Sequence, residues 1–214
     1  MHVAVNPADL SPAERHKMTI GTIVPRPIAW TTTVDAAGVA NLAPFSYFMG
    51  CHSYLPALAL SIGSRKDVPG LPKDSAANIR VTGEFVVNLV DEALAEAMNA
   101  TAAAFPPGVS EAEAAGIALS PSTLIAPPRV SESPIAMECR LLHALSLGEA
   151  PRTSTLFVGQ IVMWHVREDL LGEGYRIDQG AIHPIARMGG PNYVHARDPW
   201  TMDIPDWQDV VEQG

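Results

Sequence analysis

The residues best suited to chemistry in this chain are cations and small polar side chains between residues 64 and 80. The chain has only three lysines, and two of them, Lys66 and Lys73, lie here. Four cations face two aspartates in this segment, whereas the whole chain has a net charge of −9. This concentration of positive charge indicates a site for a phosphate. The side chains that could form it are Ser64, Arg65, Lys66, Ser75 and Asn78.

The predicted start of a helix strengthens the phosphate interpretation. Asp74 or Ser75 is expected to cap a helix that runs to about Thr82, and Gly83 is expected to end it. The free N–H groups and the dipole of a helix N-terminus attract anions. Arg65 could add charge-assisted, partly bidentate hydrogen bonds. The alternative is a solvated basic loop followed by an ordinary helix cap.

An aromatic cluster immediately precedes the basic segment. Phe45, Tyr47, Phe48 and Tyr54 are four of the thirteen aromatic residues, and Ser46 lies among them. Core packing is the better explanation of such a cluster when it is taken alone. Beside an anion site, however, an aromatic wall suits a flat ring system that carries a phosphate.

Familiar catalytic signatures are absent from the sequence. It contains no GxSxG, HExxH or GxxxxGK[ST] motif. Residues 172–174 (GEG) begin like a dinucleotide fingerprint, but Ile177 stands where the third glycine belongs. The seven histidines include no pair at metal-ligand spacing, so no metal is expected.

Composition and charge limit the partners and the compartment. The acidic pI of about 5.1 disfavours nucleic acid and anionic membranes. No run is long enough to span a bilayer and no secretory signal is visible, so we expect a cytoplasmic protein. Cys51 and Cys139 are expected to be reduced and largely buried thiols, not a disulfide.

The elements that must position these residues are mostly strands. Runs rich in β-branched and apolar residues, bounded by Gly and Pro, predict strands. They cover residues 28–34, 39–44, 57–63, 84–90, 135–145 and 155–166. A turn at residues 148–151 should join the last two, and Gly159 should bend the second of them.

Helices are predicted only in the middle of the chain. Besides the one after Asp74, they are expected at residues 91–104 and from Ser110 to about Gly116. The order of elements does not alternate as in a doubly wound sheet. It favours a mainly β protein, a closed antiparallel barrel with peripheral helices. The tail from Ala186 is expected to dock as a loop.

Four sequence blocks, in order, resemble the flavin reductase-like FMN-binding proteins, a family that includes flavoredoxins. The first comprises residues 25–33 (PRPIAWTTT) and 41–48 (NLAPFSYF). The second comprises Lys66-Asp67, residues 74–80 (DSAANIR) and residues 83–88 (GEFVVN). The others are residues 127–134 (PPRVSESP) and residues 186–190 (ARMGG) with Tyr193. The resemblance extends over about residues 19–202 and implies one flavin reductase-like domain within residues 1–214.

The resemblance implies a Greek-key, FMN-binding split barrel that forms a homodimer. By position, Trp30, Thr31 and Thr32 would line the flavin ring. Ser46, Tyr47 and Phe48 would meet its polar edge and ribityl chain. Arg187 and Tyr193 in the tail could close over the site or reach the partner subunit. The phosphate contacts would be Ser64, Arg65, Lys66, Ser75 and Asn78.

The expected activity is transfer of electrons from NAD(P)H through FMN to free flavin, oxygen or another small acceptor. The flavin would carry the redox chemistry, so no catalytic acid, base or nucleophile is required. His52 is the best candidate for a polar group on the substrate side, although a surface histidine is the simpler interpretation. A partner monooxygenase or redox protein could receive the electrons. Two alternatives remain open: a non-enzymatic FMN electron carrier, and a binding module for another phosphorylated ring.

Overall fold

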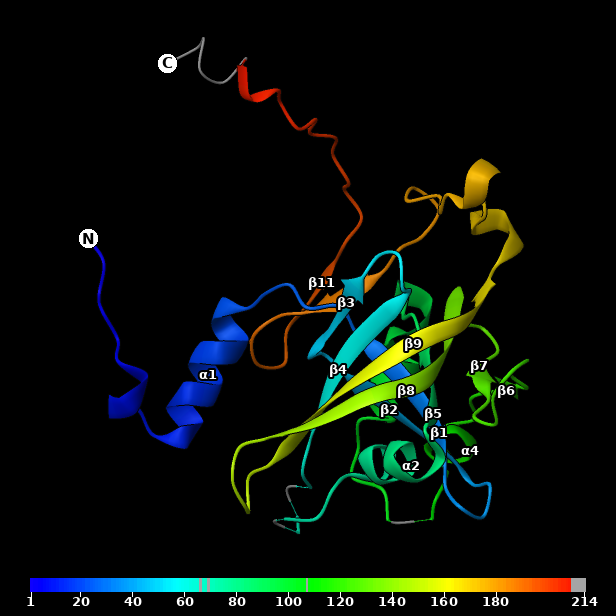
Figure 1. Ribbon diagram of the computed structural model, residues 1–214, viewed down its shortest axis with the longest axis horizontal. Helices are drawn as coiled ribbons and strands as arrows, with labels where there is room; N and C mark the ends of the chain where they lie inside the picture. The colour runs from blue at the N-terminus through cyan, green and yellow to red at the C-terminus, as the bar shows by residue number, and fades with distance from the viewer. Residues whose placement is uncertain (66, 69, 107, 209–214) are drawn as a thin grey trace.

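Runs of apolar and β-branched residues form one seven-stranded antiparallel sheet in the computed structural model, which describes residues 1–65, 67–68, 70–106 and 108–208 (Figure 1). Its strand order is β2-β1-β5-β8-β9-β4-β3. The six predicted strands are confirmed to within a few residues, and β3 is an addition to them. The strands of the sheet are β1 (Ala29–Val34), β2 (Ala40–Phe45), β3 (Phe48–His52), β4 (Ala57–Gly63), β5 (Glu84–Asn88), β8 (Ile135–Leu147) and β9 (Ser154–Val166).

The two edge strands of this sheet, β2 and β3, are consecutive in the chain. Only Ser46 and Tyr47 separate the end of β2 from the start of β3. The sheet must therefore curl until its edges meet at this link, which makes it a barrel with a seam. The strand β3 was not predicted, because its residues Met49, Gly50, Cys51 and His52 carry no alternating pattern. Cys51 is exposed on this edge strand, so the prediction that it is buried was wrong.

Short elements surround the barrel. The helices are α1 (Pro12–Thr22), α2 (Asp74–Thr82), α3 (Ala95–Ala100) and α4 (Glu111–Ala114). The 3-10 helices are η1 (Pro7–Asp9), η2 (Glu92–Leu94), η3 (Glu168–Leu170) and η4 (Glu173–Tyr175). Two small hairpins pair β6 (Leu119–Ser120) with β7 (Arg129–Val130), and β10 (Ile185–Arg187) with β11 (Tyr193–His195).

Two predicted helices differ from the structure. The helix expected over residues 91–104 consists of two short elements, η2, which Asp91 caps, and α3, which ends at Ala100. The next residue, Thr101, donates to the Met98 carbonyl and accepts from Trp30 Nε1. The helix α2 starts at Asp74, and its N-cap is Lys73, which makes no side-chain cap bond. The capping prediction was therefore wrong, but Gly83 does end α2, at a φ of 70°.

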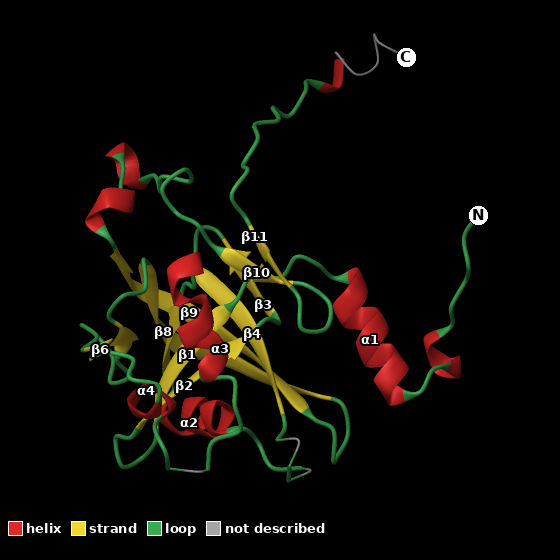
Figure 2. Cartoon of the chain, turned by 180° about the vertical axis from the view of Figure 1, so that it is seen from behind, coloured by secondary structure: helices red, strands yellow, loops and turns green. Residues whose placement is uncertain are grey.

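The core has two parts, on opposite faces of β1. One part fills the barrel and includes Leu60, Phe85 and Phe157, with Ile79 of α2 packed against them. The other lies between β1, β2 and the helices outside, around Trp30, Leu42 and Met98. Figure 2 shows α3 on this side of the sheet. Every residue of β1 is buried as a result.

The chain ends project from this barrel in both ribbon views (Figures 1 and 2). The helix α1 has no buried residue. In the tail, Trp200, Ile204 and Trp207 are exposed. Within the described residues, no helix is long and apolar enough to cross a membrane.

Candidate functional site

The link at the barrel seam is the centre of the candidate site. Two pockets lie beside the link, one on each side, and Ser46 and Tyr47 line both of them. The Tyr47 carbonyl accepts a hydrogen bond from the Ser61 N–H of β4 at 2.8 Å, which ties the link to the barrel. The predicted contact residues Ser46, Tyr47 and Phe48 therefore do lie beside open space.

The first pocket, here called the seam pocket, has a volume of about 380 Å³. Its walls come from segments far apart in the sequence: α1, the seam, α3 and the β10–β11 hairpin. Arg187 and Tyr193 lie together in it. The Arg187 guanidinium donates to the Tyr193 hydroxyl and, at 2.7 Å, to the Gly190 carbonyl. It also lies 4.4 Å from the centre of the Tyr193 ring.

Arg26 holds these walls together. Its guanidinium donates to the carbonyls of Ile20, Ile23 and Met188 at 2.6–3.0 Å. It also reaches Ser46 Oγ at 3.5 Å, and its backbone pairs with that of Arg187. Because one buried side chain joins the end of α1, the seam and the tail, it sets the shape of the pocket mouth.

The second pocket, here called the outer pocket, lies on the other side of the link. Its volume is about 370 Å³, and it shares Arg26, Ser46 and Tyr47 with the seam pocket. Its other lining residues are mostly apolar and include Phe48, Met49 and Leu156. It could accept an apolar or aromatic molecule.

The third pocket, here called the polar pocket, has a volume of about 300 Å³ and shares Pro44 and Ala102 with the seam pocket. The two therefore adjoin along the end of β2. The polar pocket is lined by the first turn of α2 and by Arg65, Lys73 and Ser75. Among the described residues no side-chain bond caps α2, so the first N–H groups of the helix can donate to an anion.

The charges of the polar pocket are mixed. Arg65 donates two hydrogen bonds to Asp67 at 2.9 and 3.1 Å and lies 3.6 Å from Asp74. The hydrogen bond from Arg65 lowers the pKa of Asp67. Lys73 Nζ lies 5.4 Å from the centre of the Phe45 ring. Among the described lining residues, two cations face three carboxylates, the third being Glu111.

A buried polar chain forms the floor of this pocket. The Asn41 side-chain amide lies 2.8 Å from Ser75 Oγ, and in its better orientation it donates to Glu111 Oε1 at 3.2 Å. The other oxygen, Oε2, accepts from the Leu42 N–H at 2.9 Å. Burial raises the pKa of Glu111.

Several predicted contact residues lie away from these pockets. Thr31 and Thr32 are buried with Trp30 inside the β1 layer, and Trp30 Nε1 donates to Thr101. Asn78 is also buried and donates to Thr33. A ligand in the pockets as described would not touch these four residues.

Three further predicted residues have other surroundings. The Ser64 hydroxyl donates to the Pro151 carbonyl and does not line the polar pocket. His52 is exposed, and its Nδ1 accepts from the Leu55 N–H, as expected of a surface histidine. Lys66 lies outside the described residues.

Sequence reasoning missed four residues of the site. Arg26 and Asn41 lie inside the first sequence block that resembles the family, so their place in that block was the available signal. Lys73 belongs to the basic segment, but its position at the start of α2 was not recognised as a contact. Glu111 gave no signal, because an acidic residue at the start of a short helix is ordinary.

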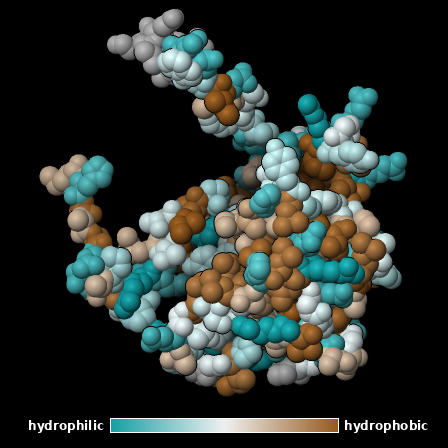
Figure 3. Space-filling view, in the orientation of Figure 1, coloured by the Kyte–Doolittle hydropathy of each residue, from teal (hydrophilic) through white to brown (hydrophobic). Residues whose placement is uncertain are grey.

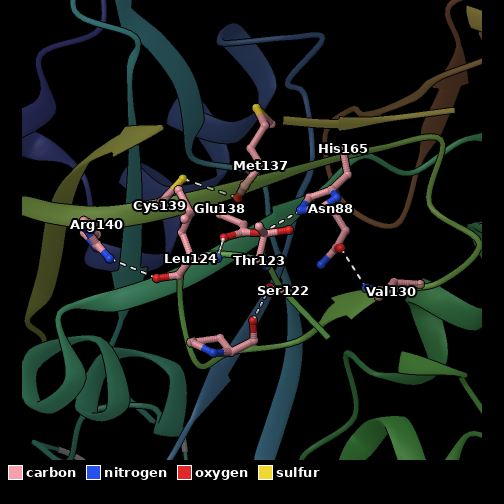
Figure 4. Close-up of polar contacts among 11 residues, drawn as sticks. Asn88, Ser122, Thr123, Leu124, Val130, Met137, Glu138, Cys139, Arg140 and His165 are labelled. Atoms are coloured by element: carbon pink, nitrogen blue, oxygen red, sulfur yellow. Dashed lines mark hydrogen bonds and ion pairs between the residues drawn. The ribbon is translucent and has the colours of Figure 1, made fainter. Parts of the chain in front are cut away.

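A second buried polar cluster lies away from the three pockets, around Glu138 (Figure 4). Its side chain is fully buried and accepts from the N–H groups of Thr123 and Leu124 at 2.6 and 2.8 Å. His165 Nε2 lies 2.5 Å from Glu138 Oε1. The cluster anchors the loop that precedes β7 to the sheet.

Comparison with known proteins assigns this chain to a family that agrees with the fold described above. Residues 20–186 match the model of the flavin reductase like domain. The crystal structure of nitrilotriacetate monooxygenase component B from Bacillus cereus is similar, with a TM-score of 0.89 and 36% identity. The alignment covers 94% of this chain and 99% of that one.

Two further structures support the same fold. The 2-nitrobenzoate 2-nitroreductase NbaA of Pseudomonas fluorescens has a TM-score of 0.86 and 32% identity, covering 96% of this chain and 98% of that one. A split-barrel structure from Shewanella frigidimarina has a TM-score of 0.79 at 21% identity, with coverage of 92% and 96%. The predicted split barrel is confirmed by this likeness.

Proposed function

We propose that this chain, which belongs to the flavin reductase-like family, is an FMN-binding oxidoreductase that takes electrons from NAD(P)H. The observation that carries the proposal is the pair of adjoining pockets at the barrel seam. One is polar and begins at the N-terminus of α2, and the other is lined by aromatic and apolar side chains together with Arg26 and Arg187. A ring system with a phosphorylated side chain needs such a pair, side by side.

The residues that would hold the phosphate are Arg65, Lys73 and Ser75, with the first N–H groups of α2. They combine charge-assisted donors with a helix dipole. Pro44, between the two pockets, would lie along the ribityl chain. Their chemistry matches a phosphate monoester, which needs several donors in a small space.

The residues that would hold the ring are those of the seam. Ser46 and the backbone of the link would meet its polar edge, and Tyr47 would cover it. Arg187 and Tyr193 would shield the opposite side from water. When bound, the flavin would supply the hydride and single-electron chemistry, so this chain has to position the ring and limit access of water to it.

The outer pocket is our candidate for the second substrate. It shares Ser46 and Tyr47 with the seam pocket, so a molecule there would lie within reach of a ring held at the seam. Its apolar lining suits an aromatic acceptor or a second flavin ring. The likeness to nitrilotriacetate monooxygenase component B favours a partner monooxygenase as the protein that uses the electrons.

The proposal extends to a homodimer. The helix α1 has no buried residue, and Met49 and Trp164 of the sheet are exposed. Figure 3 shows apolar surface gathered over the strands that face the viewer in Figure 1. Surface of this kind commonly marks an interface.

The visible spectrum of the purified protein tests the proposal. We expect a flavin spectrum, or one acquired on adding FMN, that bleaches under anaerobic NADH or NADPH and returns with oxygen. Bleaching by dithionite but by neither nicotinamide would identify an electron carrier instead. A colourless protein that FMN does not stabilise against heat would rule out flavin binding.

A further inference from the structure

Three buried side chains connect the inside of the protein with the polar pocket. Ser75, Asn41 and Glu111 are 1%, 9% and 7% exposed, and all three line the pocket. They form a continuous chain, with 2.8 Å from Ser75 Oγ to the Asn41 amide and 3.2 Å from that amide to Glu111 Oε1. The end of the chain is fixed, because Glu111 Oε2 accepts from the Leu42 N–H.

The direction of the hydrogen bonds between Ser75, Asn41 and Glu111 depends on whether Glu111 carries a proton. An ionised Glu111 can only accept, so Asn41 turns its NH₂ toward Glu111 and its carbonyl toward Ser75, whose O–H then donates to Asn41. A protonated Glu111 donates to the Asn41 carbonyl, and the amide donates to Ser75 Oγ. Only in this second arrangement is the Ser75 O–H free to donate into the pocket.

We propose that Glu111 takes up a proton when a phosphate monoester binds in the polar pocket, and that Asn41 transmits this change to Ser75. The proposal rests on the proposed function for the identity of the ligand as FMN. It explains how a pocket with three carboxylates can accept an anion. Asn41 and Glu111 thereby become positioning residues of the phosphate site.

The surroundings of Glu111 favour the protonated form once an anion is present. Burial already raises the pKa of this carboxyl, and a bound phosphate adds a like charge that raises it further. The described charged groups that share the pocket are Arg65, Asp67, Lys73 and Asp74. On α4 itself, the other acid, Glu113, is exposed. Neither β2 nor residues 101–105 contribute a charge.

Glu111→Gln is the decisive variant. The glutamine Oε1 can accept from the Leu42 N–H, and its Nε2 can donate to the Asn41 carbonyl. The hydrogen bonds are then held in the direction that leaves the Ser75 O–H free. Ser75→Ala removes the final donor instead. Circular dichroism and urea unfolding show whether each variant folds, and either variant alone can contradict the proposal.

The measurement is calorimetric titration of wild type and both variants with FMN, riboflavin and inorganic phosphate. Titrations run from about pH 5 to about pH 8, in buffers of different ionisation enthalpy that report proton uptake. We expect wild type to take up more protons on binding FMN than the Glu111→Gln variant does. The phosphate of FMN titrates in both proteins, so the difference between them reports on Glu111 alone. The affinity of wild type for FMN should fall more steeply with rising pH than that of the variant, by up to about tenfold per pH unit. Riboflavin should show no such uptake.

The other results of these titrations either support or overturn the proposed proton uptake by Glu111. Ser75→Ala should lose about tenfold in affinity for FMN and keep its affinity for riboflavin. Equal proton uptake in wild type and Glu111→Gln overturns the inference while leaving FMN binding intact. If no flavin binds but inorganic phosphate binds with an uptake that Glu111→Gln removes, the FMN proposal fails and the inference stands. If neither flavin nor phosphate binds, both are overturned.

Discussion

Two carboxylates among the described residues, Glu111 and Glu138, are buried, and their surroundings act on them in opposite ways. At Glu111, burial raises the pKa and outweighs the lowering by the backbone N–H groups of Leu42 and of Glu111 itself. At Glu138, burial also raises the pKa, but Thr123, His165 and Leu124 together lower it further, so the net shift is downward. Hydrogen bonds therefore favour the ionised form of the carboxyl more strongly at Glu138 than at Glu111.

Glu138→Gln should destabilise the protein, by about 1–3 kcal/mol at neutral pH, because its amide NH₂ would face groups that are themselves donors. The native state lowers the pKa of Glu138, so its stabilising contribution is present above the ordinary pKa of a glutamate. It is lost as the pH falls through the lowered value. The difference from wild type should therefore shrink on acidification. Urea unfolding at neutral and acidic pH measures this difference.

The matched control is Glu149→Gln, since Glu149 is exposed in the turn between β8 and β9. This variant should unfold as wild type does at both pH values. A Glu138→Gln protein that is as stable as wild type at neutral pH would show that the cluster does not anchor the loop.

At the scale of elements, packing around Gly159 determines how β9 crosses the barrel. A Cβ at Gly159 would lie 2.5 Å from the Phe85 ring and 3.4 Å from Cys139 Cβ. A bend was expected at Gly159, and the strand that faces it, β8, has a register shift between Leu141, which pairs with Gly159, and His143. Gly159 is thus required for space inside the barrel, where β5, β8 and β9 meet.

Gly159→Ala should destabilise the protein by about 1–3 kcal/mol, the cost typical of overpacking a core. Gly50→Ala is the matched control, since Gly50 also lies in a strand but a Cβ there meets nothing within 4 Å. Chemical unfolding of the two variants compares them. Equal stabilities would mean that Phe85 moves aside at little cost.

At the scale of the whole molecule, the edge strand β3 and the projecting termini leave surface for a second chain. Met49 is 58% exposed on this edge and also lines the outer pocket. An edge strand offers unpaired backbone groups, and an apolar side chain on it adds area for association. A dimer formed there would place the partner next to the proposed acceptor site.

We therefore expect sedimentation to give twice the chain mass of 22.8 kDa. Met49→Asp should shift the equilibrium toward single chains, because it puts a charge on apolar contact surface. Val81→Asp is the control, since Val81 is 74% exposed on α2 but lies away from this edge. A wild type that sediments as one chain at all concentrations would contradict the homodimer.

The sequence by itself determined the family and every strand of the large sheet except β3. Alternation and β-branched runs depend on local preferences, so the segments that became β1, β4, β8 and β9 could be identified directly. The basic segment and the aromatic cluster were also visible in the residue types, and Arg65, Ser75, Ser46 and Tyr47 do line the pockets.

Only the tertiary structure decided which polar residues face the pockets. Thr31 and Thr32 have suitable side chains, but β1 is covered on both faces, which no local pattern reveals. Arg26 became part of the site because its side chain reaches both Ser46 of the link and the Met188 carbonyl of the tail. Asn41 and Glu111 became part of it because α2 and α4 pack against β2. The sequence predicted a phosphate-binding segment, whereas tertiary packing determined its partners, since contacts between residues far apart in the chain depend on how the helices cover the sheet and not on local preferences.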